Sequence, residues 1–219
     1  MPTVYEAYQI EHGKTQDYHE KKYNIRFLNY GHGVNIEKNG VGVEVDPNIP
    51  ACFAFSYEEC SVESVIELKT LGIDDSMMNH NPPKIEITQI VNHRIDCSSS
   101  VRLVAQLSDN PRFYETSKIT EFSDTNGMAQ KSWTKGQRPC AWEKLTITLH
   151  NYYAPGTRWL KVFVAGKGNE ERKDGHFGPK IGKLLVKVTK EGETEPIIGQ
   201  SMPRIPESNS DIIDNNSNN

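Results

Sequence analysis

The stretch that decides the fold runs from residue 140 to residue 188 and reads CAWEKLTITLHNYYAPGTRWLKVFVAGKGNEERKDGHFGPKIGKLLVKV. Apolar and polar residues alternate over 144–150 and again over 159–164, on either side of a Pro155-Gly156 turn. A charge-rich loop ending in Gly-His-Phe-Gly then leads into a third alternating segment, 184–188. Strict alternation is typical of a strand with one buried face and one solvated face. This stretch therefore predicts three β-strands.

The same period of two recurs upstream, over residues 41–45, 84–88 and 101–107. Clusters of Gly, Pro, Asn and Asp separate these segments, and no alternation of helices with strands appears. The best helix candidate is the short segment 60–64. We therefore predict an all-β, antiparallel β-sandwich. The core predicted from the alternation includes Val43, Ile66, Leu68, Ile87, Leu103, Leu107, Ile147, Leu149, Leu160, Val162 and Val186.

The length of 219 residues suggests one domain with extensions at both ends. Residues 1–22 are polar and weakly periodic, and we predict a polar N-terminal extension with at most a short helix. Residues 191–219 are rich in polar residues, Asn and Ser above all, and we predict a disordered C-terminal tail. The sandwich domain is then expected to occupy residues 23–190.

Composition excludes several classes of function. The formal net charge of −4 argues against a nucleic-acid partner, because binding phosphates needs a basic face. No apolar run approaches the roughly 18 to 20 residues that span a bilayer, and the start has no apolar signal segment. We therefore expect a cytoplasmic protein without a membrane partner. There the four cysteines are expected to be free thiols, and the absence of a CxxC pair argues against a structural zinc site. We expect no cofactor.

A sparse pattern of residues runs through the chain in a fixed order. The run CFAFSYEECSVESVIEL occupies residues 52–68, and an Arg-x-Asp turn follows at Arg94 and Asp96. The last part of the pattern consists of Trp142, Thr146, Thr148, Tyr153, Gly156, Arg158, Gly175, Phe177, Gly178 and Ile181. In this order and spacing, the chain from about Tyr23 to Val188 resembles the F-box-associated domain, the substrate-reading module of sugar-recognising F-box proteins.

The resemblance implies a galactose-binding-like jelly-roll sandwich. It also implies a substrate-binding domain of SCF-type ubiquitin ligases, which would read glycoproteins in ER-associated degradation. An F-box itself would need roughly 40 to 50 residues of helical sequence, and nothing before Asn24 supplies them. We therefore expect an F-box-associated domain without its own F-box.

In sugar-binding members of that family, loops at one end of the sandwich recognise the chitobiose core of N-glycans, and aromatic rings stack on the sugars. By correspondence, Tyr57 keeps an aromatic position, but Gln89-Ile90 replaces an Asp-Trp pair. Residues 172–174 replace a Tyr-Trp-Lys run, and a histidine follows in place of a tryptophan. We therefore expect N-glycan binding to be altered or lost. The candidate ligand-binding residues are Tyr57, Gln89, Ile90, Arg172, Lys173, Asp174 and His176.

Catalytic motifs give no support for an enzyme. The seven histidines include no HExxH, and the chain has neither GxSxG nor a phosphate-binding loop motif. His93 stands near Cys97 and would resemble a thiol–base pair only if the two converge in space, so a structural role is favoured. We expect a non-catalytic module with a protein or glycoprotein partner. The alternative is a structural or assembly protein that uses the sandwich as a protein–protein interface.

Overall fold

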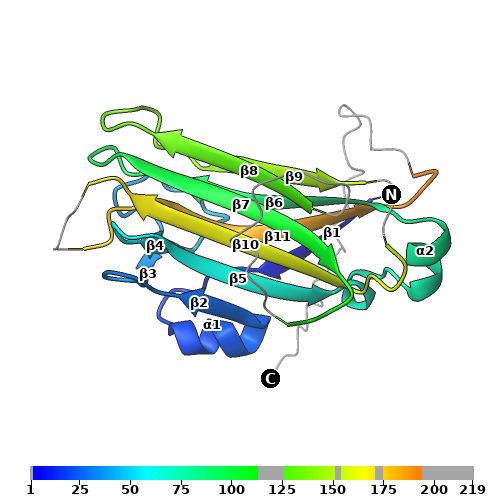
Figure 1. Ribbon diagram of the computed structural model, residues 1–219. Coiled ribbons are helices and arrows are strands. Elements are labelled where there is room, and N and C mark those ends of the chain that lie inside the picture. Colours follow the sequence, from blue (N-terminus) through cyan, green and yellow to red (C-terminus); the bar gives the residue numbers. More distant parts are fainter. Residues whose placement is uncertain (1, 113–125, 151–153, 171–174, 194–219) are drawn as a thin grey trace, which may run out of the picture.

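The structure is a computed structural model, and it describes residues 2–112, 126–150, 154–170 and 175–193. Two antiparallel sheets pack face to face, which confirms the predicted all-β sandwich (Figure 1). The first sheet contains, in spatial order, β3 (Val34–Lys38), β4 (Ala51–Phe55), β11 (Lys180–Thr189), β6 (Lys84–Asn92) and β9 (Glu143–Leu149), with β1 (Thr3–Tyr8) also paired to β11. The second contains β2 (Ile25–Leu28), β5 (Cys60–Glu67), β10 (Trp159–Gly168), β7 (Ser99–Ser108) and β8 (Asn126–Trp133).

The chain crosses repeatedly from one sheet to the other, as in a jelly roll. For example, β4 leads into β5, and β9 leads into β10, on the opposite sheet. Helix α1 (Gln16–Tyr23) lies beside β2, whereas η1 (Leu68–Leu71) and α2 (Asp75–His80) lie at the end of the sandwich where β10 begins (Figure 1). Loops at the other end connect β4 to β5 and β10 to β11. Within the described residues, no helix has the length and apolar character needed to cross a membrane.

The core lies between the sheets and contains the inward side chains of the predicted strands. The predicted core residues are buried, apart from Ile66, which packs half-buried against the core, and Val43, which lies half-buried in a loop. Phe27 and Phe53 meet edge to face at the centre, with ring centroids 4.9 Å apart. All four cysteines are free, and three of them are buried.

Two predicted elements are wrong. Residues 41–45 form no strand, because Gly40 and Gly42 adopt positive φ values of 92° and 68°, and Val45 is 73% exposed. Segment 60–64 is not a helix but the first part of β5, which pairs with β2 and β10. Its side chains are buried on both faces, and the buried residues include polar Ser61, Glu63 and Ser64.

The N-terminal residues are part of the sandwich rather than a separate extension. Strand β1 pairs with β11, and Tyr8 and Ile10 are each 1% exposed within the core. These isolated apolar residues make no periodic run, and for that reason the pattern of residues 1–22 gave no sign of a strand.

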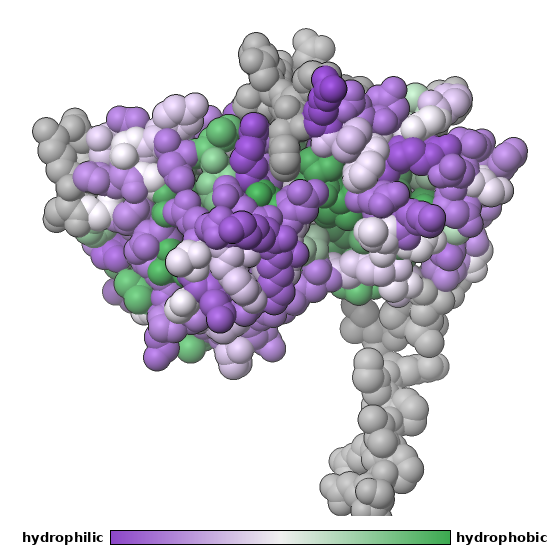
Figure 2. Space-filling model, turned by 90° about the horizontal axis from the view of Figure 1, so that it is seen from below, coloured by the Kyte–Doolittle hydropathy of each residue, from purple (hydrophilic) through white to green (hydrophobic). Residues whose placement is uncertain are grey.

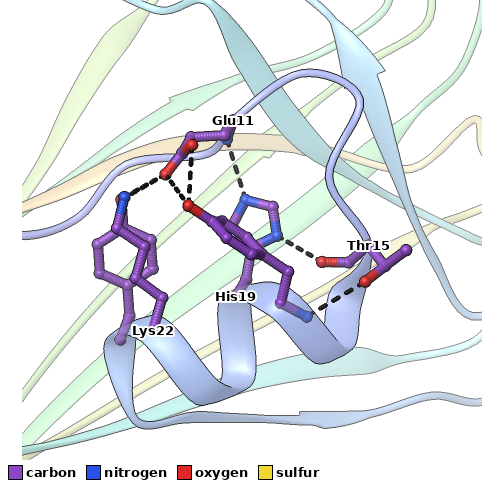
Figure 3. Close-up of polar contacts among 6 residues, drawn as sticks. Glu11, Thr15, His19 and Lys22 are labelled. Atoms are coloured by element: carbon purple, nitrogen blue, oxygen red, sulfur yellow. Dashed lines mark hydrogen bonds and ion pairs between the residues drawn. The ribbon is translucent and has the colours of Figure 1, made fainter.

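A set of polar contacts holds α1 against the chain that precedes it (Figure 3). Thr15 caps the helix by accepting a 3.2 Å hydrogen bond from the Tyr18 backbone. His19 is fully buried, and its Nε2 accepts a 3.0 Å bond from the Glu11 N–H while its Nδ1 lies 2.7 Å from the Thr15 carbonyl oxygen. The Glu11 carboxylate also accepts bonds from the Tyr18 hydroxyl and from Lys22. Hydrogen bonds to both backbone and side-chain atoms therefore hold α1 in place.

Seen from below, the surface is mostly hydrophilic, with hydrophobic residues visible in a hollow near its middle (Figure 2). Among the described residues, the large hydrophobic side chains that are exposed stand mostly apart in the sequence: Val4, Tyr30, Val41 and Val45. Scattered residues of this kind are normal on a protein surface.

Candidate functional site

Three loops converge at the end of the sandwich where β10 ends. They contribute Tyr57 from the β4–β5 loop, His32 from the β2–β3 loop and His176 from the segment before β11. The rings of His32 and Tyr57 meet edge to face, with centroids 5.7 Å apart. His176 Nε2 lies 2.8 Å from the His32 carbonyl oxygen. The predicted site residues Tyr57 and His176 are thus linked through His32, and we call these three residues the loop-end cluster.

Glycines allow these loops to approach one another. His32 stands between Gly31 and Gly33, which have positive φ values of 55° and 73°, and the Gly33 N–H closes the turn onto Tyr30. At Gly178, a Cβ atom would lie only 2.7 Å from the Ser56 carbonyl oxygen, so a larger residue would push the strands apart. The cluster therefore rests on backbone contacts that leave no space for side chains.

Arg94 braces the same end of the molecule. Its Nε and Nη2 donate to the two carboxylate oxygens of Asp96 at 2.9 and 2.8 Å, and its guanidinium lies 4.6 Å from the centroid of the Phe177 ring. A Cβ at Gly42 would lie 3.0 Å from the guanidinium, so the loop containing Gly42 also approaches it closely. Arg94 of the Arg-x-Asp turn therefore contacts Phe177, the residue that follows His176 in the chain.

A buried ion pair lies beneath these loops. The Lys180 side chain is fully buried and pairs with Glu37, which is 14% exposed. Burial raises the pKa of the nearby Cys52 thiol to about 12, so this cysteine stays protonated at neutral pH. The groups are enclosed, and we assign them to the support of the loops rather than to ligand contact.

The other predicted site residues lie elsewhere. Gln89 in β6 is fully buried, and its amide is bonded to Tyr8 and to backbone carbonyl oxygens, so it does not reach the loop-end cluster in this structure. Ile90 is 7% exposed in the same strand and supplies no aromatic ring. Arg172, Lys173 and Asp174 lie outside the described residues, and their role remains a prediction.

Sequence reasoning missed His32. The signal was the Gly-His-Gly run at 31–33, because two glycines around one polar residue indicate a tight turn that presents the side chain between them. Its contact with Tyr57 joins two residues that are 25 positions apart in the chain, so no local pattern predicts it.

The arrangement is suited to contact rather than to covalent chemistry. Within the described ranges, no group of three His, Cys, Asp or Glu residues could hold a metal ion. His93 stacks on Trp133 at a centroid distance of 5.0 Å, and its Nε2 lies 3.2 Å from the Gln137 carbonyl oxygen, as expected of a structural residue. The loop-end cluster instead presents aromatic faces and polar ring atoms at the surface.

A jelly-roll sandwich with a cluster of side chains at one loop end defines a class of proteins that present recognition loops on a β-scaffold. Residues 9–188 match the family model described as "F-box associated region", and the chain belongs to that family. The match begins before α1 and therefore includes this helix.

Two F-box proteins are among the relatives. The chain is 28% identical over 137 residues to F-box only protein 44 of Homo sapiens, a match that covers 62% of this chain and 49% of that protein. It is 22% identical over 164 residues to F-box only protein 6 of Rattus norvegicus, covering 75% and 54%. The chain thus spans about half the length of these relatives.

Similar solved structures include TmCBM61 in complex with β-1,4-galactotriose, with a TM-score of 0.40 and 12% identity, covering 74% of this chain and 86% of that one.

Proposed function

We propose that this chain is a non-catalytic recognition module that binds a protein or glycoprotein through the loop-end cluster. The observation that carries the proposal is the convergence of Tyr57, His32 and His176 from three loops onto a rigid sandwich. Binding sites are commonly formed by loops that a stable scaffold holds in place. Membership in the F-box-associated family supports a role in reading substrates.

The link to ubiquitin ligases forms a second part of the proposal. The relatives are F-box only proteins, and we infer that this module serves ubiquitin-dependent degradation of a glycoprotein or protein substrate. It would act in the cytoplasm, where free cysteines such as buried Cys52 and Cys60 stay reduced.

We further propose that binding to the chitobiose core is weak or lost. Sugar hydroxyls are already bonded to water, and exchanging those bonds for protein bonds gains little free energy. Affinity must therefore come mainly from stacking on aromatic rings. Gln89 is enclosed and Ile90 has no ring, which leaves the rings of Tyr57 and His32 in the cluster. These two rings meet edge to face, so they form no flat stacking surface for a sugar, and the cluster is better suited to a polypeptide.

Calorimetry with the free chitobiose-core glycan tests this proposal, using wild type, Tyr57→Ala and the exposed-residue control Val45→Ala. We expect no measurable heat at micromolar concentrations of protein. Micromolar binding that disappears in Tyr57→Ala but persists in Val45→Ala would contradict the proposed loss of chitobiose binding. It would show that the loop-end cluster binds this glycan.

Affinity capture from cytosol tests the protein-binding part, with half of the lysate treated with a glycosidase that removes N-glycans. Capture that survives this treatment and is lost in Tyr57→Ala supports the proposal. Capture unaffected by Tyr57→Ala, together with a stable oligomer in light scattering, would favour the structural or assembly function instead.

A further inference from the structure

A second concave site lies at the opposite end of the sandwich. Strand β10 runs from Trp159 to Gly168, so its two ends are about 30 Å apart at ~3.3 Å per residue. The loop-end cluster lies near its last residue. Helix α2 lies near its first residue (Figure 1), and a pocket of about 610 Å³ is lined by residues of α2 and of the start of β10. The polar and aromatic residues that line this pocket are Glu67, Lys69, Asp74, Asp75, Ser76, Arg158 and Trp159.

Backbone hydrogen bonds fix the walls relative to one another. The Arg158 carbonyl oxygen accepts a 2.9 Å bond from the Leu68 N–H, which joins the start of β10 to η1. Gly72 ends η1 with a φ of 70°, and the Asp74 side chain caps α2 by accepting a 2.8 Å bond from the Met77 N–H. The pocket is therefore formed before any ligand arrives, which lowers the entropic cost of binding.

The charges of the pocket are mixed and only partly paired. Arg158 Nε donates to Asp75 at 2.5 Å, and its Nη1 donates to the Thr157 carbonyl oxygen at 2.7 Å. Among the described residues, neither the Glu67 carboxylate nor the Lys69 ammonium group has a side-chain partner. The carboxylates Glu67, Asp74 and Asp75 would repel an anion, and Lys69 would repel a cation, while Arg158 is already paired with Asp75. A neutral ligand that both donates and accepts hydrogen bonds meets neither repulsion.

Trp159 adds an aromatic surface to these polar groups. The residue is half-buried at the start of β10, and its indole N–H has no hydrogen-bond partner among the described residues. An indole ring offers a flat apolar face with a donor at its edge, which matches the C–H face and hydroxyls of a sugar ring. Ile73, which is 2% exposed, adds an apolar residue to the lining. The volume lies within the range of about 300 to 1,000 Å³ typical of small-molecule sites.

We propose that this pocket binds a neutral saccharide of one or two sugar units, with Trp159 as the stacking surface and Glu67, Lys69 and Asp75 as partners for its hydroxyls. The site is separate from the loop-end cluster and goes beyond the proposed function. A ligand here and a polypeptide at the other end are able to bind at the same time, because the two sites lie about 30 Å apart.

A nuclear magnetic resonance titration of the ¹⁵N-labelled full chain tests the proposal with chitobiose, mannobiose and galactobiose as probes. The chain has three tryptophans, and Trp159→Phe identifies the indole N–H signal of residue 159. We expect at least one probe to shift the signal of Trp159 saturably, while the signals of Trp133 and Trp142 stay in place. We expect Trp159→Ala to weaken binding at least about tenfold and Glu67→Gln about fivefold.

The matched control is Trp142→Phe, which replaces a tryptophan outside the pocket and should leave the affinity unchanged. If Trp159→Ala fails to fold, Trp159→Phe and Glu67→Gln decide the question. No saturable shift with any probe overturns the proposal, and so does a stronger shift with acetyl-arginine amide, which would identify a cationic ligand. Tyr57→Ala separates the two sites: it should abolish capture of the protein partner without changing the saccharide titration.

Discussion

Tyr8 donates a 2.6 Å hydrogen bond to the side-chain oxygen of Gln89 inside the core, although the two residues are 81 positions apart. Gln89 Nε2 in turn donates to the carbonyl oxygens of Gly182 at 3.3 Å and Lys183 at 3.1 Å. These carbonyls belong to β11 where its register with β6 shifts, so Gln89 satisfies groups that the ladder leaves unpaired. Gln89 therefore has a structural role, and Tyr8 of the N-terminal strand β1 supplies the hydrogen bond to its side-chain oxygen.

Tyr8→Phe should lower the free energy of unfolding by about 1 to 3 kcal/mol, because it leaves the buried oxygen of Gln89 without a donor. Burial raises the pKa of Tyr8 well above its ordinary value, so the hydroxyl remains a donor at any ordinary pH. Urea denaturation measures the loss. The control is Tyr5→Phe in the same strand, whose hydroxyl makes no hydrogen bond within the described residues and should cost far less. Equal losses in both variants would contradict this role of Tyr8.

Leu103→Ala and Ile147→Ala should each lower the free energy of unfolding by about 2 to 5 kcal/mol, because both side chains are buried between the sheets. Val45→Ala, at a residue that is 73% exposed, should stay within about 0.5 kcal/mol of wild type. Chemical denaturation checks all three. Losses below about 0.5 kcal/mol at both core residues would mean that the strand faces are assigned wrongly.

Arg94 and Phe177 should be energetically coupled, because the guanidinium lies over the ring while Asp96 holds it in place. A double-mutant cycle with Arg94→Gln and Phe177→Leu should give a coupling energy of about 0.5 to 2 kcal/mol. The same cycle between Arg94→Gln and Val4→Ala, at an exposed residue of β1, provides the comparison. Strict additivity in the Arg94 and Phe177 cycle would show that the contact does not stabilise the loop.

His93 should make the protein less stable in acid. Burial lowers its pKa, against the opposing effects of the Gln137 carbonyl and Glu143. The unfolded chain therefore binds more protons than the folded chain below about pH 6.5, and stability must fall as the pH drops through that value.

Thermal unfolding from about pH 8 to about pH 5 measures this dependence. His93→Gln should show a smaller fall in Tm over this range than wild type. His12→Gln, which changes an exposed histidine, should follow the wild-type slope. A His93→Gln slope that is as steep as wild type would assign the acid sensitivity to another group.

The sequence by itself determined the fold class. Strands such as β7, β9 and β11 have one face in the core and one toward solvent, so burial leaves a period of two in the order of residues. That signal is local and needs no knowledge of the partner strand. Strand β5 is an exception, because its polar residues Ser61, Glu63 and Ser64 are buried together with its apolar ones, so burial there does not follow polarity.

Only the tertiary structure decided which polar residues face a ligand and which face the core. Gln89 has the chemistry of a binding residue, yet its side chain is buried. There it hydrogen-bonds the Tyr8 hydroxyl and the β11 carbonyl oxygens at the register shift. His32 and Tyr57 meet because two turns bring together loops that the sequence separates. Such contacts join residues far apart in the chain, and their free energy depends on the whole packed structure rather than on any local pattern.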